Sequence, residues 1–162
     1  MSVLMPGSKA PDFALQTAAG EKYSLSHALQ SNDIAVLVFY KVSCPVCQFA
    51  MPYLERLHRS YPGVPLWGVS QDDSDATTSF AKMYGASFPM ILDEHLASTV
   101  DYDLTNVPTT FVVESGGKIV QTISGFVKAE LEELNDRMAA AAKSSVKPLF
   151  TEADEVPVLR PG

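Results

Sequence analysis

The sequence contains two cysteines, Cys44 and Cys47, and they are separated by Pro45 and Val46. Cysteines at this spacing can exchange a dithiol for a disulfide, because one thiolate attacks a substrate disulfide and the second thiol then resolves the mixed disulfide. The same spacing also occurs in half of a zinc site and between cysteines that are merely buried and inert. Of these three interpretations we favour exchange, with Cys44 as nucleophile and Cys47 as resolving thiol.

A zinc site is disfavoured because further ligands are missing from the pattern. A structural zinc site uses about four ligands, and the histidines His27, His58 and His95 are scattered without a His-x3–5-His spacing. No metal and no organic cofactor is therefore implied. The redox-active group that we predict is the disulfide formed by Cys44 and Cys47.

The elements around the pair explain how it would be positioned. Residues 34–40 are a continuous apolar run, which is typical of a strand buried on both faces of a sheet. The next helix is expected to begin at or near Cys44, and Pro45 suits its first position because proline has no N–H to satisfy there. The unpaired N–H groups of a helix start favour a thiolate over a thiol. Cys47 then lies one turn into the helix, within reach of Cys44.

The rest of the chain alternates between strand and helix patterns. Residues 10–15 and 22–25 indicate an N-terminal hairpin, and Ser26 begins a short helix. Further strands are predicted at 64–70, 90–92, 109–114 and 118–124, and further helices at 48–61, 72–84, 95–102 and 128–143. We therefore predict an α/β fold with a central mixed β-sheet flanked by helices and an N-terminal hairpin extension.

The length of 162 residues fits one domain, which we place at residues 1–143. Residues 144–162 differ in composition, since prolines and acidic residues interrupt any periodicity. We predict an extended C-terminal tail there. Its apolar residues, Leu149 and Phe150 among them, could dock on the domain surface.

Composition excludes several other classes of function. The net charge is −7, so the clustered Lys and Arg that nucleic-acid binding requires are lacking. No stretch approaches the ~20 apolar residues of a membrane span. The N-terminus shows neither the basic nor the apolar region of a signal peptide, so we expect a cytoplasmic protein, or a periplasmic or otherwise extracytoplasmic one if a leader has been removed.

The residues around the pair resemble the active-site segment of the TlpA-like thiol-disulfide oxidoreductases. This group belongs to the thioredoxin superfamily and is related to the alkyl hydroperoxide reductase/thiol-specific antioxidant family. The resemblance rests on residues 39–47 with Met51 and Pro52, and it continues at 7–15, 69–72, 84–85, 88–89, 107–111, 116–120 and Gly125. It implies a thioredoxin-like fold and an enzyme that acts on protein thiols and disulfides. An unidentified electron donor and a monomer or weak dimer are expected with it.

The resemblance also implies a substrate platform opposite the cysteines. Pro108 is expected to be the cis-proline that faces the pair, and the backbone of Val107 is expected to bind an incoming peptide strand to strand. From propensity alone, Pro108 would be an ordinary trans proline that opens a strand.

Further residues are expected to support the site: Tyr40, Ser43, Pro45 and Pro52, the last by bending the active-site helix. Ser43 stands where the family often has Trp, which predicts a more open surface around the first sulfur. Val38 and Ala50 occupy places where relatives carry a buried acid that shuttles protons. Deprotonation of Cys47 is therefore expected to rely on water or on another group.

Two other functions stay open at this point. A peroxiredoxin-like thiol peroxidase needs a Pro-x3-Thr/Ser-x2-Cys arrangement, and counting back from Cys44 those places hold Leu37 and Lys41. The shared framework keeps peroxidase as an alternative. A non-catalytic, redox-switched binding module is the second alternative, and steady turnover of a disulfide substrate would separate it from an enzyme.

Overall fold

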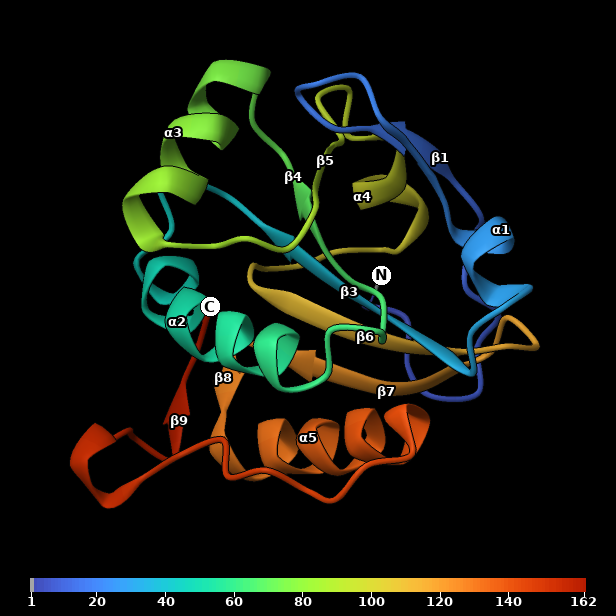
Figure 1. The fold of residues 1–162 in the computed structure, drawn as a ribbon. Coiled ribbons are helices and arrows are strands. Elements are labelled where there is room, and N and C mark those ends of the chain that lie inside the picture. The colour runs from blue at the N-terminus through green and yellow to red at the C-terminus, as the bar shows by residue number, and fades with distance from the viewer. Residues whose placement is uncertain (1) are drawn as a thin grey trace.

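The apolar run at residues 34–40 forms β3 (Ile34–Tyr40), the middle strand of a five-stranded sheet (Figure 1). The computed structural model describes residues 2–162. The strand order is β5-β4-β3-β6-β7, with β4 (Leu66–Ser70), β5 (Met90–Leu92), β6 (Thr109–Glu114) and β7 (Ile119–Ser124). β4 runs parallel to β3 and β5, whereas β6 runs antiparallel to β3 and β7. The predicted mixed sheet is confirmed.

Successive side chains of β3 face opposite sides of the sheet, and a core covers each side. The first core contains Val36, Val38 and Tyr40. It is completed by three helices, α2 (Pro45–Ser60), α3 (Ser74–Tyr84) and α5 (Lys128–Ala142). Cys47 belongs to this core, so its sulfur lies on the face of the sheet that the longest helices cover.

The second core contains Ala35, Leu37 and Phe39, the alternate residues of β3. It is covered by the N-terminal hairpin of β1 (Ala14–Gln16) and β2 (Lys22–Ser24), by α1 (Leu25–Leu29) and by Tyr102, which follows α4 (Ala97–Asp101). Figure 1 shows the hairpin, α1 and α4 grouped on one side of the sheet. Burial on both faces explains why β3 lacks alternation between apolar and polar residues.

The helix expected to begin at or near Cys44 does so, because α2 starts at Pro45 with Cys44 as its N-cap and continues through most of the predicted range 48–61. Three short elements were not predicted: β8 (Phe126–Val127), a 3-10 turn (Glu152–Asp154) and β9 (Leu159–Arg160). β8 and β9 pair with each other in a separate two-stranded sheet. Each is too short to leave a periodic pattern in the sequence.

Residues 144–162 fold back onto the domain (Figure 1). Leu149 is only 4% exposed, and Phe150 packs with its ring centroid 5.2 Å from that of Tyr53. The guanidinium of Arg56 donates to both carboxylate oxygens of Asp154, at 2.7 and 2.9 Å. The part of the tail that contains Leu149, Phe150 and Asp154 is therefore fixed to α2 by apolar packing and by a bidentate ion pair.

A buried polar network fixes the same segment to α5. The Tyr61 hydroxyl donates to Asn135 Oδ1 at 2.9 Å, and Asn135 Nδ2 donates to the Lys147 carbonyl at 2.7 Å. The Lys147 N–H donates back to the Tyr61 oxygen at 2.9 Å, which closes the network.

Within residues 2–162, no helix has the length and apolar character needed to cross a membrane.

Candidate active site

Cys44 lies where the chain leaves β3 and enters α2. It has an extended backbone conformation, as an N-cap residue should. Its Sγ accepts a hydrogen bond from the Cys47 N–H at 3.2 Å. A sulfur in this place replaces the oxygen of an ordinary cap, and the N–H together with the positive end of the helix dipole stabilises negative charge on it. Cys44 is half-buried, so part of the residue is open to solvent.

Cys47 differs from Cys44 in its surroundings although both thiols are free. Its side chain is fully buried, with 0% exposure, in the apolar core below α2. Burial, followed by the hydrogen bond with the Cys44 sulfur, raises the pKa of Cys47 well above that of an ordinary thiol. The structure therefore presents one accessible sulfur and one sheltered sulfur held in the protonated form.

Val107 and Pro108 lie beside Cys44, joined by a cis peptide bond. The Cys44 thiol donates to the Val107 carbonyl at 3.5 Å. Pro108 is buried and Val107 is half-buried. The structure thus brings together residues that are 63 positions apart in the chain.

The supporting residues of the sequence analysis lie around this pair in different roles. Pro45 is at the first position of α2 and is exposed, as is Ser43, so the surface beside the first sulfur is open. Tyr40 is fully buried, stacks on Phe80 with ring centroids 5.1 Å apart, and packs in the same core as Cys47. Pro52 lies inside α2 and is exposed.

Two polar residues that the sequence analysis did not single out hold the loop before Cys44. The Val42 N–H donates to Asp72 Oδ2 at 2.9 Å, and Gln48 Nε2 donates to the Val42 carbonyl at 2.9 Å. Both polar groups of the Val42 backbone are therefore satisfied by side chains. The only signals for Asp72 were its place at the start of the predicted helix 72–84 and its place within a segment that carried the family resemblance.

The core around Cys47 is apolar at the two places where the family resemblance suggested a buried acid. Val38 is 0% exposed and Ala50 is 5% exposed, and both belong to the core that contains Cys47. These residues supply neither a proton acceptor nor a hydrogen bond to the sulfur. Their apolar character is consistent with the raised pKa of Cys47.

A metal site and a peroxidase site are less well supported by the residues around Cys44 than thiol-disulfide exchange is. Among the described residues, no group of three or more His, Cys, Asp and Glu side chains is arranged to hold a metal ion. The two places that a peroxide-reducing site reserves for Pro and Thr hold Leu37, which is fully buried in β3, and Lys41, which is exposed. The proline and the hydroxyl residue of the peroxidase pattern are therefore both absent at Leu37 and Lys41.

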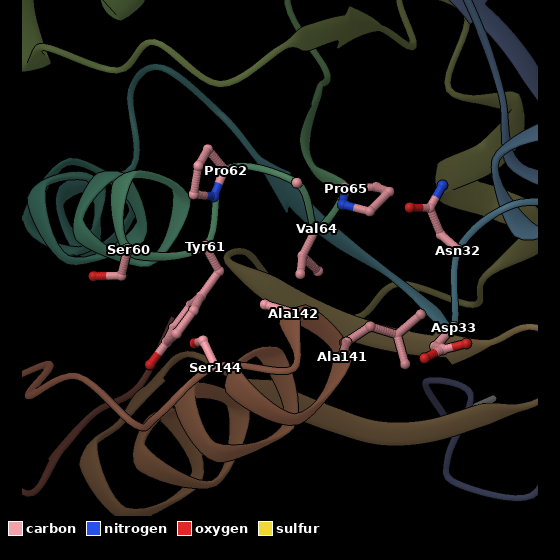
Figure 2. A pocket seen from close by; sticks show the side chains of 12 residues that line it. Asn32, Asp33, Ser60, Tyr61, Pro62, Val64, Pro65, Ala141, Ala142 and Ser144 are labelled. Atoms are coloured by element: carbon pink, nitrogen blue, oxygen red, sulfur yellow. The ribbon is translucent and has the colours of Figure 1, made fainter.

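A cavity of about 430 Å³ lies at the far end of α2 (Figure 2). Tyr61 and Pro62 line it from the end of α2, Asp33 from the start of β3, and Ala141 from α5. The 16 residues of α2 place it roughly 24 Å from the cysteines, at ~1.5 Å per residue. Its lining is therefore separate from the sulfur site.

Comparison with known families matches residues 6–122 to the AhpC/TSA family. Among curated proteins, the thiol-disulfide oxidoreductase ResA of Bacillus subtilis (strain 168) is 32% identical over 122 residues, which cover 74% of this chain and 67% of the relative. ResA of Halalkalibacterium halodurans is 30% identical over 135 residues, which cover 82% of this chain and 76% of the relative.

Solved structures show the same architecture. A proposed thiol:disulfide interchange protein DsbE from Chlorobium tepidum superposes with a TM-score of 0.75 at 27% identity, covering 86% of this chain and 99% of that chain. A proposed protein disulfide isomerase from Bacteroides thetaiotaomicron gives a TM-score of 0.78 at 24% identity, with coverage of 89% and 96%. The thioredoxin-like fold expected from the sequence is confirmed.

The hydrogen bond from Val42 to Asp72 predicts a measurable role for this carboxylate. Asp72→Ala should lower the free energy of unfolding by about 1.5–3 kcal/mol, because a half-buried N–H loses a charged partner. It should also change the rate at which iodoacetamide alkylates Cys44, since the loop before the sulfur is no longer held. Urea unfolding and alkylation kinetics measure the two effects.

Asp75→Ala is the matched control, because Asp75 is exposed in the first turn of the neighbouring helix α3. Its loss should cost only about 0.3–1 kcal/mol through the helix dipole. Equal effects of the two substitutions would contradict the role assigned to Asp72.

Proposed function

The chain belongs to the AhpC/TSA family, and from this premise we propose that Cys44 and Cys47 exchange electrons with the disulfides and dithiols of protein substrates. The curated relatives are thiol-disulfide oxidoreductases, and this chain is a thiol-disulfide oxidoreductase as well. One observation carries the assignment of roles. An accessible sulfur at a helix start accepts the N–H of a second, buried cysteine one turn later.

The first step of the proposed reduction takes place at Cys44. Its thiolate attacks one sulfur of a substrate disulfide, so a bond forms between Cys44 and that sulfur while the substrate S–S bond breaks. The other substrate sulfur leaves as a thiolate and takes a proton from solvent. The N–H of Cys47 and the helix start support this step because they stabilise the attacking charge.

The second step takes place at Cys47. Its thiol loses a proton, and the thiolate attacks Cys44 Sγ to form the intramolecular disulfide, which releases the substrate as a second thiol. Two electrons have then passed from the enzyme to the substrate. The same steps in reverse oxidise a substrate dithiol, and an electron donor or acceptor restores the starting form of the pair.

Val107 and Pro108 form the proposed substrate platform. The Val107 carbonyl lies 3.5 Å from Cys44 Sγ, and the residue is half-buried at the surface. An extended peptide that pairs with this backbone would therefore carry its own sulfur past Cys44.

The cytoplasmic location expected from the sequence stays a prediction, and so does the monomeric or weakly dimeric state.

Single substitutions of the cysteines test the assignment of roles. Cys44→Ser should abolish reduction of a protein disulfide such as insulin, because the nucleophile is lost. Cys47→Ser should abolish turnover but accumulate a mixed disulfide at Cys44, because the first step remains and the second is lost. Turnover assays and non-reducing mass spectrometry of the products distinguish these outcomes. A Cys47→Ser chain that traps no substrate would argue against the assigned order.

The reduction potential of the pair tests whether it is redox-active at all. Equilibration in glutathione or dithiothreitol buffers should give a midpoint between about −120 and −270 mV, the range of exchange catalysts. A midpoint below about −300 mV would instead describe a structural disulfide. That result would remove the basis of the proposed activity.

The raised pKa of Cys47 predicts the pH dependence of the second step. Below that pKa the thiolate fraction rises tenfold with each pH unit, so the resolving step should accelerate roughly tenfold per unit between about pH 7 and 9. Rapid mixing of the reduced enzyme with excess disulfide, followed by acid quenching, measures the decay of the mixed disulfide. A flat profile would show that proton loss from Cys47 does not limit this step.

A further inference from the structure

The last five described residues, 158–162, lie along the edge of the sulfur site. Leu159 pairs with Val127 and Arg160 with Phe126 in the antiparallel ladder of β8 and β9. The Lys128 N–H donates to the Val158 carbonyl at 3.0 Å. Figure 1 shows this segment rising beside β8 and ending next to α2, the helix that carries both cysteines.

The segment then passes over Gly125 and reaches Val107. A methyl group placed on Gly125 would lie 2.6 Å from the Arg160 carbonyl oxygen and 2.9 Å from the Gly162 nitrogen. A methyl group placed on Gly162 would collide with the Val107 carbonyl. This carbonyl is the one that accepts the thiol hydrogen bond of Cys44. The tail therefore contacts the backbone that we propose as substrate platform.

A side-chain contact adds to this backbone contact. The guanidinium of Arg160 lies 4.6 Å from the ring centroid of Phe49, a cation–π geometry. Phe49 belongs to α2, two residues after Cys47, and its ring packs 5.0 Å from that of Phe126. The chain segment at 158–162 thus touches the site on two sides, through Val107 and through the active-site helix.

The two halves of the tail are held with different strength. The first half is fixed by the burial of Leu149 and by the ion pair of Arg56 with Asp154. The second half is paired over two residues only, and Val158 and Leu159 are 75% and 56% exposed. A two-residue ladder with exposed side chains is marginal on its own. Residues 158–162 are therefore the more weakly held half of the tail.

We propose that residues 158–162 occupy the surface to which polypeptide substrates bind, so that the tail and the substrate compete for the strip between Phe49, β8 and Val107. The tail already uses the binding mode expected of a substrate there, an extended strand added beside existing backbone. This inference rests on the proposed function, because it takes Val107 as the substrate platform. It adds that the site is closed to large substrates until the tail leaves.

The competition predicts that weakening the tail activates the enzyme. The rate on a polypeptide scales with the fraction of molecules whose tail is detached. Arg160→Ala removes the cation from the Phe49 ring, and an exposed cation–π contact corresponds to a roughly twofold to fivefold change in that fraction. Gly162→Val should have at least this effect, because its side chain would collide with the Val107 carbonyl.

The experiment compares kcat/KM for reduction of insulin in the full chain and its variants. Val158→Ala is the control within the tail, since its side chain is exposed and only its carbonyl is used. Gly63→Val is the control for the glycine substitution, because a side chain there meets no atom within 4 Å. Both controls should match the wild type, whereas Arg160→Ala and Gly162→Val should exceed it.

A second measurement follows the tail itself. In the Cys47→Ser chain, a cysteine-containing peptide trapped on Cys44 should accelerate hydrogen exchange of residues 158–162, because the peptide takes their place. Unchanged hydrogen exchange of residues 158–162, or no gain in kcat/KM for either tail variant, would overturn the proposed competition. The proposed function would still stand in that case if the wild type reduces insulin. A wild type and tail variants that are all inactive would overturn the proposed function and this inference together.

Discussion

The site depends on one geometric constraint: the reactive sulfur must lie where a fully buried strand ends and a helix begins. Only residues 41–44 separate β3 from α2. β3 is hydrogen-bonded on both sides, and Phe39 pairs with Thr109, the residue that follows Pro108. Cys44 and the Val107–Pro108 segment are thus carried by neighbouring strands. Their closeness follows from the register of the sheet, so a shift of either strand would separate them.

The same junction divides the chemistry between the two sulfurs. Cys44 caps the helix and is half-buried, whereas Cys47, three residues later, points into the core. The Cys47 N–H donates to the Cys44 sulfur at the helix start, whereas burial raises the pKa of the Cys47 thiol. The two thiols are therefore distinguished both by their place in the helix and by their burial. Apolar Val38 and Ala50 reinforce that difference, because they lie in the core that surrounds Cys47.

The sequence predicted the parts of this site that local physics controls. The run at 34–40 became β3 with the expected bounds, and Pro45 took the first position of α2. Sequence reasoning missed contacts between distant residues that carry no periodic signal. Asp72 reaches Val42 across 30 positions, and Arg56 reaches Asp154 across 98. Single polar contacts of this kind depend on the finished fold, so neither propensity nor spacing reveals them.

Gly125 shows how the sheet and the tail are linked. It follows β7, has a φ of +77° that favours glycine, and donates its N–H to the Pro108 carbonyl at 2.7 Å. The turn it makes directs the chain into β8, which offers an edge to β9. Its missing side chain also leaves the space through which residues 160–162 pass to Val107. The path of the tail is therefore set by backbone shape, because the atoms that pass closest to Gly125 are the Arg160 carbonyl oxygen, the Gly162 nitrogen and the Pro161 α-carbon.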